Sequence, residues 1–266
     1  KRFYEHHIKA DITSLKLVDA ESGEGIPFLF RGLVLDKEQQ ENITAELIKK
    51  LEHKKLGILG YGMEGKSTLK LLKELLPEAD ITIADEAETA AAEYYSSGKP
   101  ELQVTGSVDI AKDSADFAGI ANIGAIVPAK NIKFFSGPDY LNGLMCCDLI
   151  FKAPGIALKK IDASLSLETI SSQADIFLSV LGHRTIGVTG TKGKSTTCAL
   201  IHAALLACGI DAMMVGNMGL PPLDAIKNDV PSRIYVFELS SHMLETVKHS
   251  PRGAVYLNLY EEHLDH

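Results

Sequence analysis

The sequence is poor in cysteine, and its cysteines do not form a recognisable pair. Four occur, Cys146, Cys147, Cys198 and Cys208, and none belongs to a C-x-x-C motif. That spacing is typical of structural zinc sites and redox pairs, so its absence argues against both. Cys198 and Cys208 lie among apolar residues with helix-like spacing. We therefore expect reduced thiols, as in a cytoplasmic protein.

Long apolar runs and an excess of positive charge are also lacking. No stretch approaches the ~18 apolar residues that a transmembrane helix requires, and no charged-then-apolar leader opens the sequence. The net charge of −8 and the pI near 5.6 provide no broad basic field of the kind that nucleic-acid binders use. We expect a cytoplasmic protein that binds small molecules, with no membrane or nucleic-acid partner.

What the sequence does contain is an alternation of short β-like runs and helix-like segments from residue 55 onward. This alternation predicts an α/β fold with parallel sheets covered by helices. The expected strands are 56–60, 80–85, 148–156, 185–190, 233–241 and 253–259, and the expected helices are 67–76, 168–181 and 195–209.

Two β-strand, glycine-loop, helix starts lie about 130 residues apart, which predicts two α/β domains. We expect a Rossmann-like domain at 55–170 and a P-loop ATPase-type parallel-sheet domain at 171–266. Residues 1–54 fit neither and are treated as an N-terminal extension, whose charged helix-like end would pack on the first domain. Residues 87–132 are rich in Ala, Gly and Ser and are expected to be irregular or an insertion.

The first glycine loop, "GYGMEGKS", fits two patterns at once. It matches the strict Walker spacing G-x-x-x-x-G-K-[ST], and it matches G-x-G-x-x-G through Gly60, Gly62 and Gly65. Asp85 ends the next expected strand, where a Rossmann-type domain places an acid near the sugar of a nucleotide. We interpret this loop as a nucleotide-binding turn in which Lys66 is incidental.

The second loop, "GVTGTKGKSTT", misses the strict spacing because position 188 is Val, yet it has the better chemical equipment. Lys194 can neutralise phosphate charge, and the Ser195 hydroxyl can bind Mg²⁺. Glu238 ends an apolar strand, where a hard oxygen ligand would project from the sheet edge. We expect this loop to bind ATP through Gly190, Thr191, Lys192, Gly193, Lys194, Ser195 and Thr196.

Several motifs together resemble one family. "GVTGTKGKSTT", "GNMGLPPL", "ELSSHMLE" and "LNLYEEHLDH", in this order, are similar to the central ATPase domain of the Mur ligases. Ahead of them, "ILGYGMEGKS", "ITIAD" and "KAPGIAL" resemble the N-terminal Rossmann-like domain of that family, which holds the UDP part of the substrate. The resemblance covers about residues 55–266, and "GNMGLP" with "ELSSHMLE" is similar to the member that adds D-glutamate.

The resemblance implies the chemistry of peptidoglycan precursor synthesis. ATP phosphorylates the alanyl carboxylate of UDP-MurNAc-L-alanine, the amine of D-glutamate attacks the acyl phosphate, and ADP and phosphate leave. The implied catalytic residues are Lys194, Glu238 and His263, and the implied Mg²⁺ ligands are Ser195, Glu238 and His263. The implied substrate-binding residues are Gly60, Gly62, Gly65, Asp85, Pro154, Gly155, Asn217 and Ser240.

The sequence departs from the family pattern at three positions. Lys192 stands where many members carry Asn, Ala153 replaces a Ser, and Glu262 replaces an Asp. The family also has a C-terminal domain that completes the ATP site and binds D-glutamate, and we expect it to lie beyond residue 266.

Three alternatives remain open. Another ligase of the same superfamily, alanine-adding or of the folylpolyglutamate type, would share the ATP loop. A nicotinamide-dependent dehydrogenase would explain "GYGMEG" and Asp85 but not "TGTKGKSTT" and the acids that follow it. A non-catalytic nucleotide-binding fragment would keep the loops without the reaction.

Overall fold

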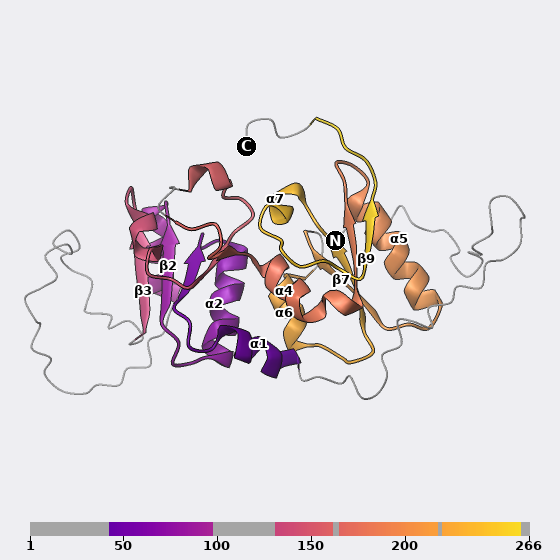
Figure 1. Cartoon of the computed structure of the whole chain (residues 1–266), viewed down its shortest axis with the longest axis horizontal. Coiled ribbons are helices and arrows are strands. Elements are labelled where there is room, and N and C mark those ends of the chain that lie inside the picture. Colours follow the sequence, from indigo (N-terminus) through magenta and orange to yellow (C-terminus); the bar gives the residue numbers. More distant parts are fainter. Residues whose placement is uncertain (1–42, 98–130, 162–164, 218–219, 262–266) are drawn as a thin grey trace, which may run out of the picture.

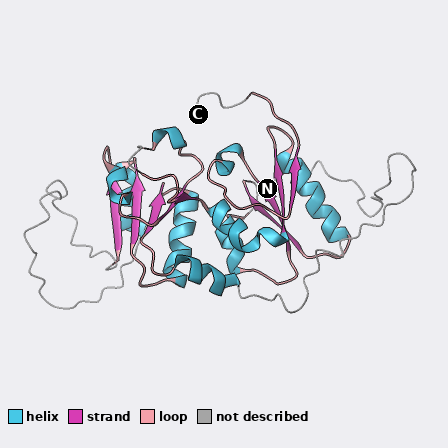
Figure 2. Ribbon diagram, in the orientation of Figure 1, coloured by secondary structure: helices cyan, strands magenta, loops and turns pink. Residues whose placement is uncertain are grey.

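Two parallel β-sheets form the framework of the molecule, with a layer of helices between them (Figures 1 and 2). The computed structural model describes residues 43–97, 131–161, 165–217 and 220–261. Every strand pair that it contains is parallel, so the α/β class with parallel sheets is confirmed.

The first sheet has five strands in the order β3-β2-β1-β4-β5. The chain runs outward from β1 to β3 and then crosses to the other side of β1 to form β4. The strand order therefore reverses between β1 and β4, and open α/β sheets bind ligands at such a point, beyond the carboxyl ends of the strands. The strands are β1 (Leu56–Leu59), β2 (Ile81–Asp85), β3 (Ile132–Ser136), β4 (Leu149–Lys152) and β5 (Ile170–Ser171).

The second sheet has four strands in the order β7-β8-β6-β9. Val188 of β6 lies opposite Glu238, the last residue of β8. The loop that follows β6 consequently begins next to the Glu238 carboxylate. The strands are β6 (Thr185–Thr189), β7 (Ala212–Gly216), β8 (Ile234–Glu238) and β9 (Gly253–Tyr256).

The helices between the sheets connect them through one hydrophobic core. Phe177 packs edge-on against Tyr235 and Phe237 of β8, with ring centroids 5.1 and 5.3 Å apart. The same cluster of buried side chains includes Ile58 of β1 and Leu71. The helices of this layer are α1 (Ile43–Leu51), α2 (Met63–Leu75), α4 (Gln173–Leu181) and α6 (Pro222–Lys227).

The remaining helices lie outside this central layer. The longest is α5 (Lys194–Ala207), which packs against β6, β7 and β8 and buries Cys198 and Leu205. The shorter ones are α3 (Glu88–Ser97), α7 (Ser241–Leu244) and the 3-10 helices η5 (Tyr140–Leu144), η6 (Leu158–Lys160) and η7 (Gly182–Arg184). Within the described ranges, no helix has both the length and the apolarity needed to cross a membrane.

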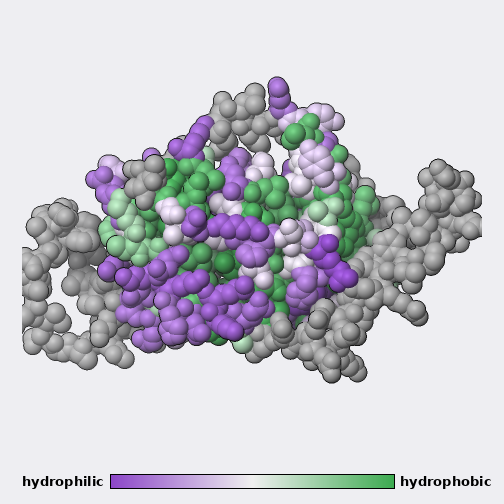
Figure 3. Space-filling model, viewed as in Figure 1, coloured by the Kyte–Doolittle hydropathy of each residue, from purple (hydrophilic) through white to green (hydrophobic). Residues whose placement is uncertain are grey.

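Helix α1 belongs to the central core. Ile43, Leu47 and Leu51 recur at helical spacing, and all three are buried. We expected this segment to pack on the first domain, but α1 contacts α4 and α6. Its opposite face is charged, and hydrophilic side chains form a band along this edge of the molecule (Figure 3).

Several expected elements differ from those observed. The helix expected at 168–181 begins only at Gln173, because Ile170–Ser171 form β5 and the Ser172 hydroxyl caps α4 by accepting a hydrogen bond from the Asp175 N–H. The region 87–132, expected to be irregular, contains helix α3 and opens strand β3, while 98–130 lie outside the described residues. Strands β3 and β7 were not expected at all.

Candidate functional site

The loop after β6 has a backbone shape that only glycine allows. Gly190 has φ +140°, and a Cβ there would lie about 3.0 Å from the Leu257 side chain and 3.1 Å from the Asn258 backbone. Gly193 adopts the left-handed conformation, with φ +88°, and forms the N-cap of α5. Bare backbone N–H groups at the start of a long helix favour a bound anion. The loop therefore provides a phosphate-binding backbone at the carboxyl edge of the second sheet.

Lys194 closes this loop on itself. Its ammonium donates hydrogen bonds to the carbonyl oxygens of Gly190 (2.6 Å) and Thr191 (2.9 Å). The positive charge is thereby held over the loop, within the space that a phosphate would approach. A phosphate oxygen can replace a carbonyl as its acceptor, and hydrogen bonds between ionised groups are about twice as strong as neutral ones.

The carboxylate of Glu238 is buried beside the first turn of α5. The Ser195 hydroxyl donates to its Oε1 atom at 3.0 Å, and the Asn217 amide donates to the same oxygen at 3.4 Å. Glu238 is only 2% exposed, and its buried Oε2 atom has no hydrogen-bond partner among the residues that the structure describes. A buried carboxylate oxygen without a partner is costly, and a cation bound to it would remove that cost.

These atoms fit Mg²⁺. The ion prefers oxygen ligands and is usually bound by one or two protein groups, with phosphates and water completing its shell. Ser195 and Glu238 are such a pair at the start of the phosphate loop. Across the described residues no group of three or more His, Cys, Asp and Glu side chains is placed to hold a metal. His263, expected as a third ligand, and Glu262 lie outside the described residues.

Asn258 braces the phosphate loop, and the sequence interpretation missed it. Its side-chain Oδ1 accepts from the Lys192 N–H at 2.9 Å, its Nδ2 donates to the Lys192 carbonyl at 3.0 Å, and its backbone carbonyl accepts from the Thr191 N–H at 3.0 Å. The Tyr260 N–H adds a bond to the Thr191 hydroxyl at 2.9 Å. Asn258 lies within "LNLYEEHLDH", a segment in which only His263 was predicted as a site residue.

Asn217 and Ser240, which were expected to bind substrate, both lie next to Glu238, but their contacts differ. Asn217 is exposed and touches the Glu238 carboxylate. Ser240 caps α7, and its hydroxyl accepts a hydrogen bond from the Met243 N–H at 3.3 Å. A serine hydroxyl has further donor and acceptor capacity, so this cap leaves Ser240 able to bind a second group.

The turn after β1 depends on two of its three glycines for its shape. Gly60 has φ +95°, and a Cβ on Gly65 would lie 2.0 Å from the Gly60 carbonyl oxygen. Gly62 is different, because a Cβ there would have nothing within 4 Å. Gly60 and Gly65 therefore form the tight turn, and Gly62 leaves the backbone open to a ligand.

Asp85 lies beside this turn and holds it in place. Its two carboxylate oxygens accept hydrogen bonds from the backbone N–H groups of Tyr61 (2.6 Å) and Ala87 (2.8 Å). The Tyr61 ring packs edge-on against Tyr94 and Phe134, at 5.7 and 5.4 Å. These contacts show that Asp85 braces the turn, and its expected contact with the sugar of a nucleotide stays a prediction. Each oxygen retains a lone pair for a ligand.

The turn after β4 meets the turn after β1 at the point where the strand order reverses. The Ala153 N–H donates to the Leu59 carbonyl at 2.9 Å, and a Cβ on Gly60 would lie 2.9 Å from the Ala153 side chain. Pro154 is half-buried, and Gly155 is exposed with open space around it. Gly62, in the turn after β1, and Gly155, in the turn after β4, thus supply open backbone at the point where the strand order reverses.

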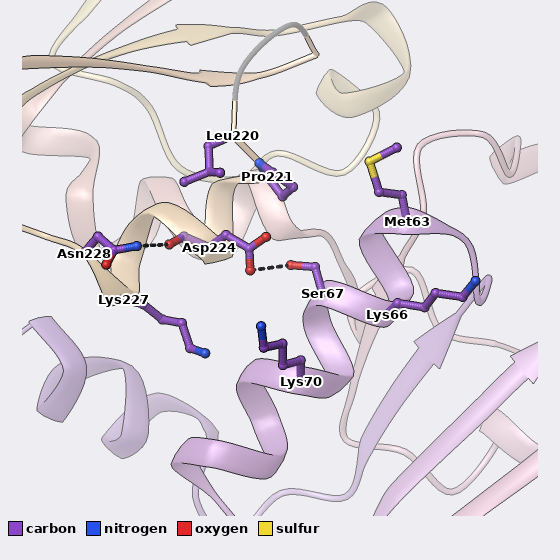
Figure 4. A pocket seen from close by; sticks show the side chains of 9 residues that line it. All are labelled: Met63, Lys66, Ser67, Lys70, Leu220, Pro221, Asp224, Lys227 and Asn228. Atoms are coloured by element: carbon purple, nitrogen blue, oxygen red, sulfur yellow. Dashed lines mark hydrogen bonds between the residues drawn. The ribbon is translucent and has the colours of Figure 1, made fainter. Parts of the chain in front are cut away.

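The strict Walker residues of the first loop are engaged elsewhere. Lys66 forms an ion pair with Glu93, and the Ser67 hydroxyl donates to Asp224 at 3.0 Å. Both residues border a cavity of about 440 Å³ between α2 and α6 (Figure 4). Ser67 and Asp224 point toward each other there, with Met63 and Pro221 above them. Ser67 thus donates to a carboxylate as Ser195 does, but Asp224 belongs to α6, whereas Glu238 ends a strand of the same sheet as the phosphate loop.

Comparison with known proteins identifies the second sheet. Residues 188–266 match the Mur ligase middle domain. UDP-N-acetylmuramoylalanine–D-glutamate ligase of Acetivibrio thermocellus is 30% identical over 220 residues, which are 82% of this chain and 41% of that protein. The enzyme of the same name from Ruminiclostridium cellulolyticum is 34% identical over 137 residues, which are 50% of this chain and 30% of that protein.

A third relative carries a different name. UDP-N-acetylmuramoyl-L-alanine–L-glutamate ligase of Xanthomonas euvesicatoria pv. vesicatoria is 29% identical over 236 residues, 82% of this chain and 42% of that protein. This chain spans less than half the length of each of these relatives. The matched segment begins at Val188, within the strand that leads into the phosphate loop, and it includes Ser195 and Glu238. By these matches residues 188–266 belong to the Mur ligase middle-domain family, and the longer chain resembles Mur ligases.

Proposed function

We propose that this chain forms the nucleotide-substrate and ATP sites of an ATP-dependent amide ligase that adds glutamate to UDP-MurNAc-L-alanine. The observation that carries the proposal is the buried Glu238 carboxylate, which has one oxygen bound by Ser195 at the phosphate loop and the other without a partner in the described part of the chain. The match of residues 188–266 to the Mur ligase middle domain supports the type of reaction.

In this proposal each of the two sheets binds a different substrate. The crevice at Gly62 and Gly155 of the first sheet, in residues 55–170, binds the uridine diphosphate part of the substrate. The loop after β6, in residues 171–266, binds ATP. Open backbone suits a diphosphate because N–H groups can approach its oxygens closely.

The reaction proceeds in two steps. A carboxylate oxygen of the alanyl group attacks the γ-phosphorus of ATP and displaces ADP. The amine of glutamate then attacks the acyl carbon, phosphate leaves with the C–O bond electrons, and the nitrogen loses a proton. Activation is needed because a free carboxylate is a poor electrophile.

The residues of this chain act by charge and by position. Lys194 exchanges its bonds to the Gly190 and Thr191 carbonyls for bonds to phosphate oxygens, where it stabilises the charge that develops during transfer. Ser195 and Glu238 hold Mg²⁺, which, when bound, neutralises phosphate charge. Asn258 keeps the loop in the shape that presents its N–H groups.

The identity of the amino acid rests on the relatives. Those from Acetivibrio thermocellus and Ruminiclostridium cellulolyticum are named for D-glutamate, and that from Xanthomonas euvesicatoria is named for L-glutamate. We propose D-glutamate, because the motifs "GNMGLP" and "ELSSHMLE" resemble those of the D-glutamate-adding member. L-glutamate is the second candidate, because that relative matches as large a share of this chain.

Phosphate release by the full-length protein tests the proposal. Release should require ATP, Mg²⁺, UDP-MurNAc-L-alanine and one enantiomer of glutamate together. It should be absent when L-alanine replaces glutamate or when folate replaces UDP-MurNAc-L-alanine. Release that needs no UDP-linked substrate would contradict the ligase. Calorimetric titration with UDP, NAD and folate separates the alternatives, because a dehydrogenase would bind NAD more tightly than UDP.

A further inference from the structure

Lys152 is a buried lysine at the centre of the first sheet. It is the last residue of β4 and lies in register with Leu59, the last residue of β1. Its side chain is only 1% exposed. It therefore lies at the carboxyl end of β4, next to the point where the strand order reverses. Removing an ammonium group from water is costly unless partners satisfy it, and burial lowers the pKa of Lys152 accordingly.

The ammonium of Lys152 has three hydrogen-bond partners, which match its three N–H donors. It donates to the Ile156 carbonyl at 2.6 Å and to the Ala153 carbonyl at 3.4 Å. Both carbonyls belong to the turn that contains Pro154 and Gly155. The lysine thus ties the two ends of this turn together from below.

The third partner comes from the second half of the chain. The Glu245 carboxylate accepts from Lys152 at 3.3 Å, and its side chain is 28% exposed. Glu245 follows α7 directly, and α7 follows Glu238 after the Ser240 cap. One ammonium therefore links the turn beside Gly60 to the segment that leads away from the Glu238 carboxylate.

The three donors of Lys152 are taken up by two carbonyls and the Glu245 carboxylate, so this side chain acts through the turn and not on a ligand directly. A role in fold stability alone is a poor explanation, because an apolar side chain of similar volume usually stabilises a buried position at least as well as an ion pair does. What the ammonium offers and an apolar side chain does not is a fixed set of hydrogen bonds to two carbonyls and a carboxylate.

We propose that Lys152 is a positioning residue that fixes the 153–156 turn for the nucleotide substrate and connects it, through Glu245, to the ATP site. The identity of the two ligands rests on the function proposed above. The positioning itself does not, because it can be measured on the protein without ligand.

Lys152→Met tests the proposal, since it keeps an unbranched chain of similar length without the charge. Lys133→Met is the matched control, because Lys133 is an exposed lysine on β3 of the same sheet. Hydrogen exchange of a peptide covering 153–157 reports the turn, whose Ile156 N–H donates to the Ala153 carbonyl. Calorimetry with UDP and with MgATP reports the two sites.

In Lys152→Met we expect exchange at 153–157 to be about tenfold faster and UDP to bind about tenfold more weakly, with the MgATP affinity changed less than about twofold. Lys133→Met should leave all three measurements unchanged. A folded Lys152→Met protein with unchanged exchange at 153–157 would overturn the proposal. If the wild-type protein does not bind UDP, the proposed function fails, and the exchange result still decides whether Lys152 holds the turn.

Glu245→Gln is a second variant, and it leaves the buried Lys152 side chain in place. It leaves the bonds from Lys152 to both carbonyls in place, so UDP affinity should change less than about threefold. The link between the sites should weaken, so any effect of bound MgATP on UDP affinity in the wild-type protein should shrink toward none. An unchanged effect in Glu245→Gln, or the absence of such an effect in the wild-type protein, overturns the connection through Glu245.

Discussion

The Ser195 hydroxyl donates a hydrogen bond of 3.0 Å to Glu238, although 43 residues separate them in the sequence. The parallel register of β6 and β8 brings them together, because Val188 and Glu238 are paired across the two strands. The first turn of α5 then carries Ser195 over the end of β8. This pair is the part of the site from which the proposed ATP chemistry follows.

Replacing Glu238 with Gln should abolish Mg²⁺-dependent ATP turnover while the fold is retained. The amide has nearly the same shape, and its oxygen can still accept the bond from Ser195, but it carries no charge for the metal and places an NH₂ group where the unpaired Oε2 atom stands. We expect at least a hundredfold loss of phosphate release, because charge stabilisation at a transferring phosphate typically contributes several kcal/mol. Circular dichroism checks the fold, and full activity in Glu238→Gln would remove the metal assignment.

The two lysines of the glycine loops should differ sharply when each is replaced with Ala. Lys194→Ala removes a phosphate-binding ammonium, and since a bond to a charged group contributes ~1.5–3 kcal/mol, ATP affinity should fall about 10- to 150-fold. Lys66→Ala removes a partly exposed ion pair with Glu93, worth at most about 1 kcal/mol of stability, and should leave ATP binding nearly intact. Equal losses of ATP affinity in both variants would contradict the assignment of ATP to the loop after β6.

Local patterns were sufficient to predict the two glycine loops and their strands. Each loop is encoded by a contiguous stretch of apolar residues, glycines and helix-forming residues. The strand-end acid Glu238 could also be predicted, because parallel strands deliver their following residues to the same edge. These features depend on neighbours in the sequence and on one general rule of topology.

The features that were missed depend on contacts distant in the sequence. Asn258 braces a loop 66 residues away, and Lys152 meets a carboxylate 93 residues away. The hydrophobic periodicity of a segment gives no information about pairs so distant in the sequence. Strand β3 was missed because it bears exposed residues at Lys133 and Phe135 and so lacks a continuous buried apolar run.

The packing of α1 shows the same limit. Its buried stripe of Ile43, Leu47 and Leu51 is legible in the sequence, but a stripe does not specify which surface it covers. Proximity in the chain favoured the first sheet, which starts at Leu56. The structure places α1 against α4 and α6, and its buried side chains belong to a hydrophobic cluster that includes residues of both sheets.

Asn258→Ala should weaken MgATP binding without affecting UDP binding. The variant removes both side-chain bonds to Lys192, so the phosphate loop loses part of its brace and must be ordered by the ligand instead. At roughly 0.5–1.5 kcal/mol for each neutral hydrogen bond, two bonds predict a loss of affinity of about 5- to 150-fold. Asn131→Ala, far from the loop on the first sheet's edge, is the matched control, and a MgATP affinity unchanged in Asn258→Ala would contradict the brace.

Glu64 should make the stability of the protein depend on pH. This carboxyl lies in the first turn of α2, and burial raises its pKa to about 7, although the charge of Lys152 acts to lower it. The folded protein therefore keeps a proton on Glu64 in a pH range where the unfolded chain has released it. The free energy of unfolding should fall as pH rises from about 4.5 to about 7, by up to about 3 kcal/mol at ~1.36 kcal/mol per pKa unit.

Glu64→Gln should remove this dependence, because the amide stays neutral at every pH. Urea denaturation of the variant and the wild-type protein should give similar free energies at about pH 4, below both pKa values, and the variant should be more stable by up to about 3 kcal/mol at about pH 8. Glu78→Gln, which removes an exposed carboxylate just after α2, controls for the change in net charge. If Glu64→Gln and Glu78→Gln follow the same curve as the wild-type protein, the Glu64 carboxyl is ionised in the fold at neutral pH, and its proximity to Lys152 outweighs the effect of burial.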